Sequence, residues 1–115
     1  MKKVYHLEKC STCKRILKEL NWDEETQEIR AEKITEKQLD EMAALASSYE
    51  ALFSRRAIKY KTLKLKEKIL SEADYKQLIL EYDTFLKRPV FLIDGAIFIG
   101  NTKKTVEAVQ AALHE

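Results

Sequence analysis

VFLIDGAIFI, residues 90–99, contains an Asp94-Gly95 pair between two apolar runs that are rich in β-branched and aromatic residues. A two-residue Asp-Gly connection between such runs is typical of a tight β-hairpin. The stretch therefore predicts two antiparallel strands, at 90–93 and 96–99. Residues 100–102 end the hairpin, and a final helix is marked by apolar residues at helical spacing, namely Val106, Val109 and Leu113.

The start of the chain predicts a strand followed by a helix. Residues 3–7, KVYHL, have strand composition. The Cys10-Ser11-Thr12-Cys13 motif follows, and Ser11 or Thr12 is suited to cap a helix. Ile16, Leu17 and Leu20 then share one helical face. The two cysteines are therefore expected at the N-terminus of this helix.

The middle of the chain is predicted to be mainly helical after a weaker strand at residues 26–31. Thr35 and Gln38 form a capping box for a helix that runs to about Ala46. Residues 49–65 predict short helices and turns with a basic cluster. Ser71 and Asp74 form a second capping box, with apolar residues at helical spacing after it.

This order of elements predicts an α/β fold. A parallel β-α-β unit and a late hairpin give a mixed four-stranded sheet flanked by helices, which is the thioredoxin-like arrangement. A chain of 115 residues corresponds to one domain, here 1–115, with an inserted helical segment at about 33–85. The net charge of +2 gives no general attraction to nucleic acid or to acidic membranes. With neither a signal peptide nor a membrane span in the sequence, we expect a cytoplasmic protein.

The chain has two cysteines, three positions apart. In a reducing compartment this spacing indicates redox chemistry or metal binding. Zinc needs more ligands than His6 and His114 readily supply, so we predict no metal. A cysteine at a helix N-terminus is stabilised as the thiolate, and Lys9, Lys14 and Arg15 add positive charge. Cys10 is therefore the predicted nucleophile and Cys13, one turn away, the predicted resolving thiol; the alternative is two small core residues.

Two further segments could bind an anion. Arg88 precedes Pro89, which is the only proline, and a cis bond there would hold the backbone beside the thiol. The Arg88 guanidinium could then hold an oxyanion or a carboxylate, although an ordinary surface arginine is the alternative. Arg55 and Arg56 form a second candidate anion clamp or a solvated charge pair. The five lysines from Lys59 to Lys68 are interpreted as a solvated face.

Taken together, these motifs resemble the arsenate reductase-like family, of the glutaredoxin-coupled type, which also contains the Spx transcription regulators. The resemblance covers nearly the whole chain in order and rests on the Tyr5-x₄-Cys10-x-x-Cys13-Lys14-Arg15, Ile34-Thr35-x₃-Leu39, Phe53-Ser54-Arg55-Arg56 and Lys87-Arg88-Pro89 motifs, and on Asp94-Gly95 between strands. It implies a thioredoxin-like fold with an inserted helical segment. It also implies that Cys10 is catalytic and that Arg88 and Arg56, or Arg55, bind the oxyanion.

The resemblance implies one of two functions. In the reductases the thiolate attacks arsenate, glutathione attacks the adduct and glutaredoxin recycles the enzyme. The expected substrate is thus a small oxyanion or glutathione, with no bound cofactor and with glutaredoxin or thioredoxin as partner. Spx-like members instead use a CxxC disulfide switch and bind RNA polymerase. This chain has Glu8 where a proline is usual and Asn101 where a third arginine is expected, which predicts weak arsenate binding.

Overall fold

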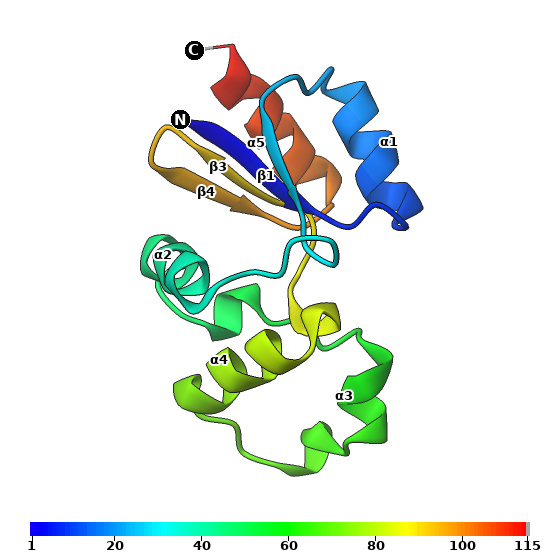
Figure 1. Ribbon diagram of the computed structural model, residues 1–115, viewed down its shortest axis with the longest axis vertical. Helices are drawn as coiled ribbons and strands as arrows, with labels where there is room; N and C mark the ends of the chain where they lie inside the picture. Colours follow the sequence, from blue (N-terminus) through cyan, green and yellow to red (C-terminus); the bar gives the residue numbers. More distant parts are fainter. Residues whose placement is uncertain (115) are drawn as a thin grey trace. The chain divides into compact units, whose positions relative to one another are not determined.

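The computed structural model describes residues 1–114; Glu115, the last residue of the predicted domain, lies outside them. The predicted mixed four-stranded sheet is confirmed, with the strand order β2-β1-β3-β4 (Figure 1). β1 is parallel to β2 and antiparallel to β3, and β3 is antiparallel to β4. The strands are β1 (Lys2–His6), β2 (Glu25–Glu28), β3 (Val90–Ile93) and β4 (Ala96–Ile99).

The hairpin forms where its sequence predicts it. Ile93 pairs with Ala96, and the two connecting residues have positive φ, 47° at Asp94 and 87° at Gly95. This is the backbone that a two-residue turn of the mirror-image type requires, and glycine adopts it without steric cost. The carboxylate of Asp94 also accepts a hydrogen bond from the N-terminal amino group at 2.9 Å. The connection therefore anchors the N-terminus of the chain beside the hairpin.

The chain divides into two compact units, the first formed by residues 1–33 together with the chain from Arg88 onward. This unit holds the sheet, α1 (Ser11–Glu19) and α5 (Lys103–Leu113). Both helices share one core cluster with β1 and β3, made by Val4, Ile16, Leu20, Phe91, Ile93 and Val109. Trp22 adds an edge-on contact with Phe91, with ring centroids 5.3 Å apart. The apolar face predicted for the first helix is therefore the face that covers the sheet.

The second unit, residues 34–87, is helical, compared with predicted limits of about 33 and 85. Its longer helices are α2 (Glu36–Ala46) and α4 (Glu72–Glu81). Both predicted capping boxes are present, at Thr35 with Gln38 and at Ser71 with Asp74. The shorter elements are η1 (Glu50–Leu52), α3 (Ile58–Thr62), η2 (Leu65–Glu67) and η3 (Asp83–Phe85). Its centre is aromatic: Phe53 stacks on Phe85 and contacts Tyr75, each with ring centroids 4.9 Å apart.

Several predicted boundaries are wrong. The first strand spans Lys2–His6 rather than residues 3–7. The second strand ends at Glu28 rather than at residue 31, because the Glu28 carboxylate accepts hydrogen bonds from the N–H groups of Arg30 and Ala31 and closes a turn. The first helix is capped by Cys10 rather than by Ser11 or Thr12.

Within residues 1–114, none of the helices is both long enough and apolar enough to cross a membrane.

Candidate functional site

Cys10 lies at the junction between the β1–α1 loop and the first turn of α1. Its backbone is extended, with φ −85° and ψ 108°, and its carbonyl accepts the N–H of Lys14 at 3.1 Å. These are the features of an N-cap residue, whose side chain lies beside the unpaired N–H groups of the helix. The Cys10 sulfur is therefore placed where a helix favours negative charge.

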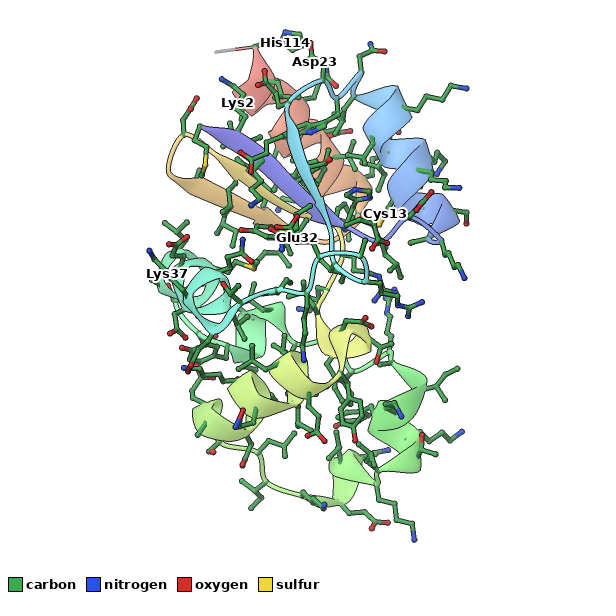
Figure 2. The ribbon with its side chains drawn as sticks, in the orientation of Figure 1. Lys2, Cys13, Asp23, Glu32, Lys37 and His114 are labelled. Atoms are coloured by element: carbon green, nitrogen blue, oxygen red, sulfur yellow. The ribbon has the colours of Figure 1, made fainter. Side chains whose placement is uncertain are left out.

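Cys13 lies in the first turn of α1, where Figure 2 labels it. It is inaccessible to solvent, with 0% exposure, whereas Cys10 is partly exposed. Burial of the Cys13 thiol, together with its hydrogen bond to the Cys10 sulfur and the negative charge there, raises its pKa to about 11. The N–H of Leu7 and the charge of Arg88 act in the opposite direction but are outweighed. At neutral pH the pair is therefore asymmetric, because Cys13 keeps its proton.

The thiol of Cys10 has a pKa below that of an ordinary cysteine. Burial alone would raise this pKa, but the N–H and S–H groups of Cys13 outweigh it by stabilising the thiolate. The charge of Arg88 and the N–H of Thr12 lower the pKa further. Cys10 thus combines partial exposure with thiolate stabilisation, as reactive cysteines do.

The positive charge that acts on Cys10 comes mainly from Arg88, which corrects the expectation for Lys9, Lys14 and Arg15. Lys9 and Lys14 are solvent-exposed, where water screens their charge. Arg15 extends along α1 and pairs with Glu19 at 3.7 Å. The charge of Arg88, which is distant in sequence, therefore lowers the pKa of Cys10 more than the charges of its sequence neighbours do.

Arg88 and Pro89 lead into β3, which pairs with β1 in the centre of the sheet. The Arg88–Pro89 peptide bond is cis. Pro89 is buried, and its carbonyl accepts the N–H of Gly100 at 2.9 Å. Arg88 is partly buried and lies close enough to both cysteines to affect their pKa values. A cation at this place can hold an anion next to the Cys10 sulfur.

Arg55 and Arg56 belong to the helical unit and differ from each other. The Arg55 guanidinium pairs with Glu50 at 2.8 Å, donates to the Tyr75 hydroxyl at 2.9 Å and lies over the Phe53 ring. These contacts give Arg55 a structural role inside its own unit. The Arg56 side chain is exposed, and among residues 1–114 no hydrogen bond or ion pair occupies its guanidinium. Of the two, Arg56 is the arginine that remains available for an anion.

Three side chains bring complementary chemistry to one place: a stabilised thiolate, a protonated thiol and a guanidinium, from Cys10, Cys13 and Arg88. Asn101 is exposed between β4 and α5 and supplies no charge. Residues 1–114 contain no group of three His, Cys, Asp or Glu side chains that could hold a metal ion. The arrangement is suited to nucleophilic attack by sulfur on an anionic substrate.

Sequence reasoning missed one residue beside the site. Glu28 is the last residue of β2, and its carboxylate accepts the N–H of Glu8, two residues before Cys10, at 2.6 Å. A glutamate at the end of a short polar strand gives little indication of this contact, because the donor lies 20 residues away in the sequence.

The chain is similar to known proteins in sequence pattern and in fold. The model of the ArsC family matches residues 5–109. Comparison with curated proteins found no matching relative. Among solved structures, the chain is similar to the YffB protein, with 23% identity, a TM-score of 0.82, and coverage of 98% of this chain and 99% of that one.

Two further structures have the same fold. An arsenate reductase from Vibrio cholerae has 18% identity and a TM-score of 0.78, with 96% of each chain covered. An arsenate reductase (ArsC) related protein from Brucella melitensis has 22% identity and a TM-score of 0.72, with 93% of this chain and 92% of that chain covered.

Proposed function

The chain belongs to the ArsC family, and we propose that it is a thiol-dependent oxidoreductase of the arsenate reductase type in which Cys10 is the nucleophile. The observation that carries this proposal is the Cys10 thiolate at the start of α1 with Arg88 beside it. The proposed substrate is a small oxyanion such as arsenate, or glutathione, whose carboxylates Arg88 would bind. Neither a metal nor a bound cofactor is required, because both electrons come from thiols.

In the proposed first step the Cys10 thiolate attacks the central atom of the oxyanion. For arsenate a sulfur–arsenic bond forms, and an arsenic-bound hydroxyl group takes up a proton from solvent and leaves as water. Arg88 stabilises the negative charge of the substrate and of this transition state. The same guanidinium lowers the pKa of Cys10, so it supports both partners of the reaction.

In the proposed second step a thiol attacks the Cys10 sulfur. A disulfide forms, the sulfur–arsenic bond breaks, and its electron pair leaves with arsenic as arsenite. Cys13 can act as this thiol because two causes of its high pKa, the hydrogen bond to Cys10 and the Cys10 charge, disappear once Cys10 is bonded to substrate. Cys13 therefore becomes easier to deprotonate only after the adduct has formed. Glutathione is the alternative attacking thiol.

The two cysteines are expected to form a reversible disulfide under mild oxidation. Peroxide converts the Cys10 thiolate to a sulfenic acid, and attack by the Cys13 sulfur then forms the S–S bond and releases water. Mass spectrometry of the intact protein should show the loss of two hydrogens, which dithiothreitol restores. Overoxidation of Cys10 to the sulfinic acid with Cys13 unchanged would contradict a resolving role for Cys13.

The proposed function is tested by a turnover assay with arsenate, glutathione and glutaredoxin, with thioredoxin replacing the last two in a second arm. Arsenate-dependent thiol oxidation that requires Cys10 would support the reductase, and the active arm would identify the electron donor. Absence of turnover in both arms, with a reversible Cys10–Cys13 disulfide and co-purification with RNA polymerase, would contradict it and favour an Spx-like redox regulator.

A further inference from the structure

The Glu28 carboxylate forms an unusual set of contacts for a side chain that is not buried in the core. Its Oε2 accepts the N–H of Glu8 at 2.6 Å, and its Oε1 accepts the N–H groups of Arg30 and Ala31 at 2.7 and 2.8 Å. Three backbone donors thus converge on one carboxylate. Hydrogen bonds to a charged acceptor are shorter and stronger than those between neutral groups.

These bonds join the loop that leads to the reactive thiol with the turn after β2. Glu8 lies in the β1–α1 loop, two residues before Cys10, and Arg30 and Ala31 lie in the turn after β2. The same loop is closed by the N–H of Cys10, which donates to the Leu7 carbonyl at 3.1 Å. The path from Leu7 to Cys10 is therefore closed by one backbone hydrogen bond between its ends and is bound at Glu8 by the Glu28 carboxylate.

We propose that Glu28 is a positioning residue for the Cys10 thiolate, acting through the N–H of Glu8. By fixing the loop of residues 7–10, its carboxylate keeps the Cys10 sulfur against the N–H groups at the start of α1 and near Arg88. This inference rests on the proposed function only in that Cys10 is taken to react as a thiolate. It adds a residue that sequence reasoning did not identify.

The charge balance around Glu28 is consistent with this role. The pKa of Glu28 is lowered, mainly by the N–H of Glu8 and also by those of Ala31 and Arg30 and by the charge of His6, while burial opposes the shift. A lowered pKa means that the bonds stabilise the folded protein above the ordinary range of a glutamate and are lost as pH falls through the folded pKa. At neutral pH the carboxylate is charged and all three bonds persist.

The direction in which the pKa of Cys10 changes in Glu28→Gln distinguishes a positioning role of Glu28 from a simple effect of its charge. In Glu28→Gln a negative charge is removed near Cys10, which by itself would lower the pKa of the thiol. The glutamine carbonyl oxygen can accept from only one of the two sets of backbone donors, and its NH₂ group cannot accept from the other. Loss of positioning would instead raise the pKa of Cys10. We expect the alkylation midpoint of Cys10 to rise by about half to one pH unit. This is the change in pKa that results from weakening one hydrogen bond to the thiolate.

The experiment measures iodoacetamide alkylation of Cys10 against pH, with Cys13→Ser in every protein. Glu24→Gln is the matched control, because Glu24 is exposed near the start of β2 and the charge change is the same; its midpoint should not move. A rise confined to Glu28→Gln supports the proposal. An unchanged or lower midpoint in Glu28→Gln overturns it.

A second measurement does not depend on the variant folding. Hydrogen exchange in the unmutated protein should show protection of the Glu8, Arg30 and Ala31 amides, and free exchange at these three positions would overturn the proposal. The proposed function and the role of Glu28 can also be contradicted separately. If the parent Cys10 titrates like an ordinary cysteine, the proposed function fails; if it titrates low but Glu28→Gln leaves it unchanged, only the role of Glu28 fails.

Discussion

Replacing Cys10 by serine is expected to reduce thiol-dependent turnover by at least about three orders of magnitude. Serine keeps the size and the N-cap position, but its hydroxyl is not ionised near neutral pH and cannot form the covalent sulfur intermediate. The measurement is the initial rate of substrate-dependent thiol oxidation. Because serine is itself a good N-cap residue, the variant should fold, and its thermal unfolding should match that of the parent.

Cys13→Ser is the matched control for this prediction. It also exchanges sulfur for oxygen, but at the buried position of the same turn. The variant should retain formation of the Cys10 adduct, and its turnover reports whether Cys13 or an external thiol resolves that adduct. Activity that survives in Cys10→Ser would contradict the nucleophilic role of Cys10 and with it the proposed function.

Replacing Arg88 by alanine is expected to weaken anion binding by about one to two powers of ten. A charge-assisted hydrogen bond to an anion contributes about 1.5–3 kcal/mol, and 1.4 kcal/mol corresponds to a tenfold change in affinity. The same variant should raise the pKa of Cys10, since Arg88 is the cation that lowers it. Calorimetry with arsenate, sulfate and glutathione gives the affinities, and alkylation against pH gives the pKa.

The control for Arg88→Ala is Arg15→Ala, which removes the same charge from the exposed face of α1. It should leave both anion affinity and the Cys10 midpoint unchanged. Arg56→Ala tests whether Arg56 also binds the anion, as the Phe53-Ser54-Arg55-Arg56 motif predicts. Equal anion binding by the parent and by Arg88→Ala would contradict the assignment of Arg88 to the substrate site.

Much of the fold could be predicted because its signals are local. The Asp94-Gly95 turn and the capping boxes at Thr35 and Ser71 each depend on residues within a few positions of one another. Such interactions leave a recognisable pattern in the sequence, and the structure contains all three. The mixed sheet then follows from the order of the elements and from the preference for short, right-handed connections.

The site could be predicted only in part, because its energetics depend on contacts between distant segments. The CxxC spacing and the Arg88-Pro89 pair identify candidate residues, but the sequence does not say which cation acts on Cys10. The cations nearest in sequence are Lys9, Lys14 and Arg15. The cation that lowers the pKa of Cys10 is nevertheless Arg88. The role of Glu28 was missed for the same reason, because its donor, the N–H of Glu8, lies in the β1–α1 loop, 20 residues away in the sequence.

The proposed function requires Cys10 to be an activated thiolate, which the pH dependence of its alkylation reveals. The measurement uses Cys13→Ser, so that Cys10 is the only thiol, and the same protein in denaturant as the reference. We expect the folded protein to alkylate with a midpoint clearly below that of the denatured chain, because helix N–H groups and Arg88 stabilise the thiolate. Identical midpoints in the folded and denatured protein would contradict it.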